Sequence, residues 1–385
     1  MKVKCLLFCF MVMVVFYTSC VKSFAPEIEK YGELMVVDGW ITDSPGPYTV
    51  RLSTSSQLKQ LVKFNPYSGC KLTVTDDVGG SFSLTEKTAG VYKTDSASFR
   101  AIPGRKYKLT ILAPNGEEIE STEEQLPNSV AIDKLYEEFQ HRSDPQKYYG
   151  RDGFQFFVDL GTLPTRDNFF LWKLDCTYKF KVDYEISSYY TDGKRYDVIK
   201  GDTLRECYRN VDILDFYLLS TKDLQQPIVK RFPLNYEDNY TKALTIRYSL
   251  FVKQYAINES SFEYWNAIKK MRDGQSDLFS QQPFQVKNNI FNLTHTDVPV
   301  LGYFTVAGYS EKRIFVDHPP TLENRYDTCS IQGDPVKHLD DYLRRHPALW
   351  PYFFPDKSYG DRLLDQECID CRKIGVQQKP SFWVD

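Results

Sequence analysis

Beyond its first 17 residues the sequence has no apolar run that approaches the roughly 20 residues of a membrane-spanning helix. It also has no stripe of basic residues, because 48 Lys and Arg are interspersed with 51 Asp and Glu and the net charge is −3. The first absence predicts a body that stays outside the bilayer core. The second absence disfavours nucleic acid as a partner.

Catalytic and metal-binding motifs are also absent. None of the five histidines belongs to an HExxH pattern, and no GxSxG, Walker or GxGxxG motif follows an expected strand. Paired carboxylates occur, for example Glu123 with Glu124, but acid and base roles depend on a spatial separation that the sequence does not show. The sequence therefore predicts no catalytic residue, no metal and no cofactor, and it favours a non-enzymatic protein.

The first residues form an export signal. Two lysines precede an apolar run from Leu6 to Tyr17, which is too short to cross a bilayer of about 30 Å. Small residues then lead to Cys20, as in a bacterial lipoprotein signal whose cysteine becomes the lipidated first residue. Tyr17 stands where such signals usually carry Leu, so ordinary signal cleavage and an uncut anchor stay open. We expect a signal peptide over 1–19, a lipid on Cys20 that holds the protein to a membrane, and a tether over 20–32.

Six cysteines follow the predicted lipidation site: Cys70, Cys176, Cys207, Cys329, Cys368 and Cys371. In an oxidising envelope they are disulfide candidates, and six cysteines allow 15 pairings. We expect Cys176 to pair with Cys207 across neighbouring strands, and Cys329 to pair with Cys368 or Cys371. A redox or zinc role for the CxxC motif is the alternative, although no βαβ unit precedes it and no second ligand pair accompanies it.

Residues 33–126 read as short strands separated by turns. The segment Leu34–Ile41 is rich in β-forming residues, and Tyr107, Leu109 and Ile111 alternate with polar residues. Gly79 with Gly80 marks a tight turn of the kind that joins hairpin strands. This pattern predicts an immunoglobulin-like or transthyretin-like β-sandwich that ends near residue 126.

Residues 127–385 predict a larger, antiparallel β-rich domain with a few short helices, so the chain as a whole is expected to be mainly β. The expected strands are longer and more aromatic: Phe154–Leu160, Phe169–Tyr184, Ile213–Leu219 and Leu244–Ala256. Ser260 and Glu263 have the spacing of a capping box and predict a helix that ends at Gly274. A second short helix is expected over Val336–Arg345.

Two aromatic stretches lie in polar or proline-rich surroundings and are candidates for a binding loop. They contain Tyr189, Tyr190 and Tyr196, and Trp350, Tyr352, Phe353 and Phe354. The favoured interpretation is that these rings plug the end of the β-domain, and a binding loop is the alternative. If they bind, a partner protein is favoured over a small molecule, because interfaces are enriched in aromatic anchors.

Several separated segments carry a resemblance to a known family. They are Ser280–Val286, Val300–Phe304 and Arg313–Phe315, together with an opening strand pair over Leu34–Leu52 and a closing stretch over Cys368–Trp383. The sequence resembles the Bacteroidetes lipoprotein family called domain of unknown function 4249, over essentially the whole mature chain.

The resemblance implies an outer-membrane lipoprotein of the sort often encoded beside TonB-dependent transporters. Our leading hypothesis is an accessory or ligand-capture partner of such a transporter; a stand-alone surface adhesin or structural module, or an envelope hydrolase acting on glycan or peptide, are the alternatives. No acidic residues directly follow Cys20, so the cell-surface and periplasmic leaflets both stay open. Ser96 and Thr203 resemble the O-glycosylation acceptors of these bacteria.

Overall fold

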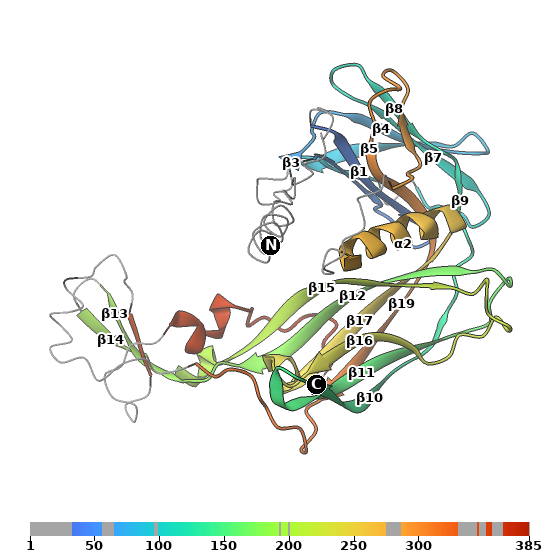
Figure 1. Ribbon diagram of the computed structural model, residues 1–385. Coiled ribbons are helices and arrows are strands. Elements are labelled where there is room, and N and C mark those ends of the chain that lie inside the picture. Colours follow the sequence, from blue (N-terminus) through green and yellow to red (C-terminus); the bar gives the residue numbers. More distant parts are fainter. Residues whose placement is uncertain are drawn as a thin grey trace, which may run out of the picture.

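The computed structural model describes residues 33–55, 65–95, 99–191, 194–198, 201–274, 286–329, 345, 352–355 and 365–384 (Figure 1). The predicted leader, Cys20 and the tether lie outside these residues, as do Ser96, Trp350 and all but the last residue of the helix expected over Val336–Arg345. Within the described part of the chain, no helix has both the length and the apolar character that crossing a bilayer requires.

The mainly β prediction is confirmed, and the described residues up to 125 contain nine strands. They are β1 (Met35–Thr42), β2 (Thr49–Thr54), β3 (Asn65–Pro66), β4 (Lys71–Asp76), β5 (Ser81–Thr88), β6 (Val91–Thr94), β7 (Lys106–Leu112), β8 (Glu118–Ser121) and β9 (Glu124–Gln125). Alternation determines which face of each strand is buried. In β7, for example, Tyr107, Leu109 and Ile111 point into the core of this N-terminal unit, and the residues between them do not.

The larger unit is built from two sheets that pack face to face. One contains β12 (Phe169–Lys181), β15 (Glu206–Ser220) and β17 (Arg247–Ile257), and the other has the order β10 (Ile132–Asp144), β11 (Lys147–Leu160), β16 (Phe232–Asp238). Their facing side chains form one core, in which the fully buried Trp172 donates a hydrogen bond of 2.9 Å from its indole N–H to Gln254. Burying this apolar surface is the main stabilising term of the unit.

Strand β19 (Leu301–Asp317) belongs to both units. Its first half pairs in parallel with β1, from Val36 opposite Leu301 to Thr42 opposite Ala307, and its second half pairs antiparallel with β17. The result is a continuous sheet of 14 strands whose main path is β15-β12-β17-β19-β1-β2-β6-β5-β4-β7-β8-β18, where β18 is Ile290–Asn292. The N-terminal unit therefore extends beyond the predicted boundary at residue 126 and includes β18 and half of β19.

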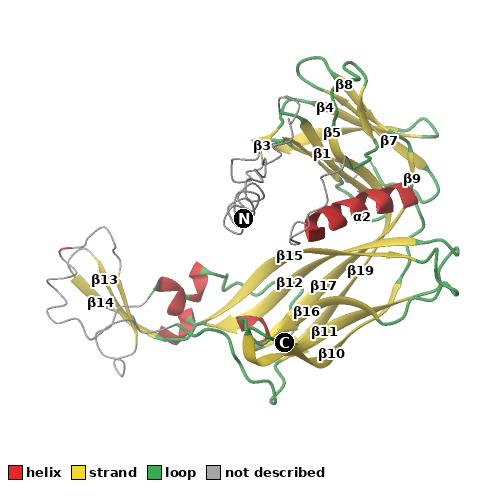
Figure 2. Cartoon of the chain, viewed as in Figure 1, coloured by secondary structure: helices red, strands yellow, loops and turns green. Residues whose placement is uncertain are grey.

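The α-helix α2 (Glu259–Gly274) lies between the two units (Figure 2). The described part of the helix spans Glu259–Gly274; it begins at Glu259, so the expected capping box at Ser260 and Glu263 does not form its start. Trp265 and other apolar residues of the helix pack against a small cluster on the outer face of the large sheet. The helix therefore covers part of that face.

A buried carboxylate ties the helix start to both units. Glu124 in β9 is 5% exposed and accepts hydrogen bonds from Asn258 (2.9 Å), Asn289 (3.1 Å) and the Tyr303 hydroxyl (3.0 Å). The Ser260 hydroxyl also donates to it, at 3.4 Å. These neutral donors compensate for the loss of water around the charge.

A third sheet, with the order β14 (Lys194–Asp197), β13 (Ile186–Thr191), β20 (Tyr352–Pro355), projects beyond the end of β12 (Figure 1). We call it the projecting sheet. Three short 3-10 helices lie near its base: η1 (Gly201–Leu204), η5 (Gln366–Cys368) and η6 (Cys371–Lys373). Another, η2 (Lys242–Leu244), precedes β17.

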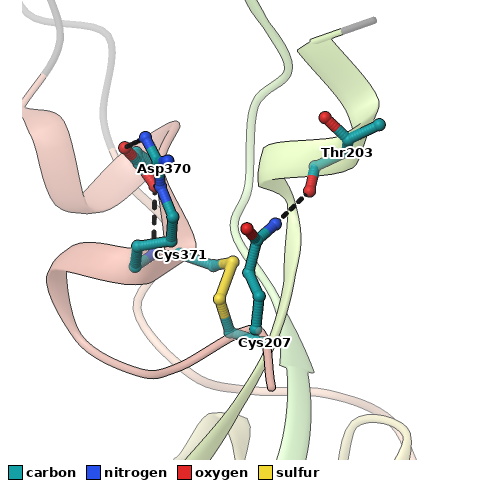
Figure 3. Close-up of a disulfide and its surroundings, with 6 residues drawn as sticks. Thr203, Cys207, Asp370 and Cys371 are labelled. Atoms are coloured by element: carbon teal, nitrogen blue, oxygen red, sulfur yellow. Dashed lines mark hydrogen bonds and ion pairs between the residues drawn. A yellow bond between two sulfur atoms is a disulfide. The ribbon is translucent and has the colours of Figure 1, made fainter. Parts of the chain in front are cut away.

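The predicted Cys176–Cys207 disulfide is wrong. Strand register explains why: Cys176 lies opposite Val211 and Cys207 lies opposite Phe180, so the two cysteines are four positions apart along the ladder. Cys207 is bonded to Cys371 instead (Figure 3), and Cys176 is a free thiol inside the core. Burial raises its pKa to about 12.

The other disulfide joins Cys329 to Cys368, one of the two pairings that the sequence left open, with a Cα–Cα distance of 5.9 Å. Both halves of the CxxC motif are therefore in disulfides to other parts of the chain. Cys70 is the second buried free thiol among the described residues, and burial raises its pKa to about 11.

Candidate functional site

The two aromatic stretches that the sequence singled out meet in the projecting sheet. In β13, Tyr189 lies opposite Tyr196 of β14 on one side and opposite Phe353 of β20 on the other. Tyr190 and Ser188 lie opposite Tyr352 and Phe354. Segments separated by more than 150 positions thus pair in one sheet, which projects from the larger unit (Figure 1).

Alternation divides the tyrosines between the two faces of this sheet. The rings of Tyr189 and Tyr196 stack with their centroids 5.3 Å apart, and Tyr196 is 41% exposed. Tyr190 points to the opposite face and is 4% exposed, so it does not belong to the open surface that the sequence predicted. Among the tyrosines whose side chains the structure describes in this sheet, the accessible feature is the Tyr189–Tyr196 pair.

The base of the projecting sheet is braced by the Cys329–Cys368 disulfide. Ile186, the first residue of β13, packs with Cys368 and Ile369 in a separate apolar cluster. The Tyr184 backbone N–H donates to the Cys368 carbonyl at 3.0 Å, and its hydroxyl donates to the Cys329 carbonyl at 2.9 Å. The sheet is therefore carried on a short, covalently reinforced stem.

Thr203 lies in η1, close to this stem, and its side chain is exposed. Its backbone carbonyl accepts a hydrogen bond from the Gln377 side chain, beside the Cys207–Cys371 disulfide (Figure 3). The expected glycosylation acceptor is thus at the surface of a segment that is held in place by the C-terminal chain.

A second candidate site is a cleft of about 1020 Å³ between the N-terminal unit and the large sheet. We call it the aromatic cleft, because its walls include Trp40, Tyr255, Trp265 and Tyr309, together with the amine of Lys173. No part of it was predicted from the sequence. Its residues come mainly from β1, β2, β12, β15, β17, β19 and α2, and only the strand order brings them together.

Strand periodicity explains why these side chains face the cleft. In β1 the odd-numbered residues fill the core of the N-terminal unit, so Asp38 and Trp40 point the other way. In β12 the even-numbered residues fill the core of the larger unit, so Lys173 and Asp175 point outward. The cleft is therefore the space between the outer faces of the two units.

Comparison with known proteins identifies the family. The model of "Domain of unknown function (DUF4249)" matches residues 21–313. The chain belongs to the DUF4249 family. No curated protein matches this DUF4249 sequence.

One solved structure with some similarity is the crystal structure of a DUF4785 family protein from Legionella pneumophila subsp. pneumophila str. Philadelphia 1. It is 10% identical, with a TM-score of 0.17, and the match covers 58% of the DUF4249 chain and 52% of the Legionella chain. The DUF4249 chain thus spans about half the length of that protein. At this TM-score the similarity carries no argument.

The two sites of this DUF4249 protein differ in chemistry. The projecting sheet presents a stacked tyrosine pair beside exposed residues of β14, whereas the aromatic cleft is concave and combines rings with charged groups. Among the described residues, no three His, Cys, Asp or Glu side chains gather as a metal site would require. Both surfaces present groups that can take part in binding.

Proposed function

We propose that this DUF4249 protein is a non-enzymatic, lipid-anchored protein of the outer membrane that accompanies a TonB-dependent transporter and helps to capture its ligand. One observation carries the proposal: two aromatic stretches that are distant in sequence are brought together on a sheet that projects from the body (Figure 1). Tyrosine rings on a braced projection offer a large contact area at low entropic cost, and aromatic residues dominate protein interfaces.

The lipid on Cys20 supplies the second part of the proposal. A protein held in the same membrane as its partner meets it at a high effective concentration, so a contact of modest area is sufficient. The stacked Tyr189–Tyr196 pair would be the centre of that contact.

Affinity capture tests this function. The tagged full-length protein is extracted from membranes in mild detergent, and co-purified proteins are identified by mass spectrometry. We expect the wild type to recover a β-barrel TonB-dependent transporter, and a variant with Tyr189→Ala and Tyr196→Ala to recover it at least tenfold less.

A matched control removes two tyrosines elsewhere. Tyr148 and Tyr149 are 95% and 62% exposed near the β10–β11 turn, outside the projecting sheet. A variant with Tyr148→Ala and Tyr149→Ala should retain the transporter. Recovery of no transporter by the wild type, or equal recovery by both double variants, contradicts the proposal. Binding to matrix material in a strain without the transporter would favour the adhesin instead.

A further inference from the structure

The aromatic cleft contains a connected row of rings. Trp40 lies with its centroid 5.5 Å from that of Trp265 and 4.9 Å from that of Tyr255, and Tyr255 lies 5.3 Å from Tyr309. The rings belong to α2, β1, β17 and β19, so both units contribute to the row. Rings in a concave site provide flat apolar surfaces on which the apolar faces of sugar rings can pack.

A single ammonium group lies over this row. The Lys173 Nζ is 3.8 Å from the centroid of Trp40 and 5.0 Å from that of Trp265. Both contacts are within the range of cation–π attraction. An amine held between two indoles has few water molecules around it. An anion that pairs with this amine would therefore stabilise its charge.

The other cations of the cleft already have carboxylate partners. Lys253 pairs with Asp175, and Arg51 lies 3.5 Å from Asp38. Among the described residues, no carboxylate forms an ion pair with Lys173. Burial lowers the pKa of the Lys173 amine to about 8; the Asp38 charge opposes this, and the Arg51 and Lys253 charges add to it.

Carboxylates on the walls of the cleft limit which anion can enter. Asp212, Asp215 and Glu311 line it as well, and they would repel a ligand with many closely spaced negative charges. The same oxygens accept hydrogen bonds, so they suit the hydroxyl groups of a sugar. The cleft thus combines stacking surfaces, hydrogen-bond acceptors and one unpaired cation.

We propose that the aromatic cleft binds an oligosaccharide that carries one carboxylate-bearing sugar among neutral ones, with the rings of Trp40 and Trp265 packing on the sugars and Lys173 pairing with the carboxylate. This inference rests on the proposed function only in assuming that the protein binds a ligand. The cleft volume of about 1020 Å³ is at the upper end of small-molecule sites and accommodates several sugar units.

Isothermal titration calorimetry of the detergent-solubilised full-length protein tests the inference, with no transporter present. The probe is xylotetraose that carries one glucuronic acid branch, and unbranched xylotetraose is its neutral match. We expect the acidic probe to bind at least tenfold more tightly. Lys173→Met should abolish this preference, so that the two probes bind with equal affinity.

Two further variants distinguish a direct loss of binding from a loss caused by misfolding. Lys134→Met removes an exposed cation in β10, outside the cleft, and should bind as the wild type does. Trp265→Leu should weaken both probes alike, and it tests the ring row even if Lys173→Met fails to fold. Equal affinity for the two probes, no binding of either, or tighter binding of a tetraalanine peptide overturns the inference. Since the transporter is absent, each of these results leaves the capture experiment unaffected.

Discussion

The sulfur atoms of Cys207 and Cys371 are bonded although the two residues are 164 positions apart. The bond fastens the C-terminal segment to the start of β15, and backbone hydrogen bonds of 2.8 Å in both directions between Tyr208 and Val376 continue the attachment. Trp383 then packs edge-on against Tyr208, with the centroids 5.0 Å apart. The last described residues are thus held to the large sheet.

Replacing Cys207 with Ser should free Cys371 and leave the Cys329–Cys368 bond in place. Loss of a native disulfide typically costs roughly 2–5 kcal/mol, because the unfolded chain regains the freedom of a long loop. Alkylation with mass spectrometry should label Cys371, and thermal unfolding should report the loss of stability. Cys70→Ala, which alters a buried free thiol, is the control that breaks no bond. Labelling of Cys371 in the wild type would contradict the pairing.

Replacing Glu124 with Gln should loosen the junction of α2 with both units. The amide would place an N–H₂ group against Asn258 or Asn289, which already donate to this position. We expect the free energy of unfolding in urea to fall by about 2–3 kcal/mol, since buried donors lose their charged acceptor. Glu123→Gln is the matched control. The Glu123 side chain is exposed and lies 3.9 Å from Lys106, so its change should cost less than about 1 kcal/mol. Similar losses in the two variants would argue against the buried network.

Gly302 should tolerate no side chain, because a Cβ atom there would lie 1.9 Å from the Val37 carbonyl oxygen. Its φ of +97° is also unfavourable for alanine. Gly79 has a similar φ of +91° but open space around it, so Gly79→Ala measures the backbone term alone, about 1–2 kcal/mol. Gly302→Ala should cost at least about 3 kcal/mol in chemical denaturation, because β1 and β19 must separate. Equal losses of stability in the two variants would show that β1 and β19 separate at little cost.

Glu237 should make the protein less stable as the pH rises from about 4.5 to 7. Burial, with a smaller contribution from Asp238, raises the pKa of Glu237 from 4.5 to about 7, and the hydrogen bond from Thr241 opposes the shift. In this window the unfolded chain loses the proton and the folded protein keeps it, so a rise in pH favours unfolding. Glu237→Gln should therefore raise the free energy of unfolding by roughly 1–3 kcal/mol at pH 8 and change it little at pH 4. Urea titrations at both pH values provide the measurement, and a gain that is independent of pH would exclude this titration.

Cys20 should carry the lipid. Cells grown with radiolabelled palmitate should incorporate label into the wild type and not into Cys20→Ser, and globomycin should block maturation of the wild type only. Cys70→Ala serves as the matched cysteine change. Unlabelled wild-type protein would remove the basis for a membrane anchor.

Local patterns predicted the strands well. The alternation in β7 and the expected turn at Gly79, whose φ is +91°, depend on neighbouring residues only, and the structure has both. The strand expected over Phe169–Tyr184 corresponds to β12. Burial of one face of each strand determines this part of the fold, and a sequence shows which face is apolar.

Pairings between distant segments were not predictable. Leu301–Asp317 has the composition of a strand, but nothing local indicates that one half of it pairs with β1 and the other with β17. The error at Cys176 and Cys207 has the same origin, since a shift of four positions in register separates two thiols on neighbouring strands. The aromatic cleft also depends on which distant strands pair. Nothing in the sequence therefore indicated that Lys173 and Trp40 lie close together.

The strand shared by the two units has a consequence for how the molecule folds. During export β1 arrives before β2, and the strand that must cover its other edge arrives only after β18. Until then β1 keeps an open row of backbone donors and acceptors, which invites pairing with another chain. Closing the sheet late, through parallel contacts between distant segments, is intrinsically slow. Exported chains of this protein should therefore depend on a holding chaperone until β19 has arrived.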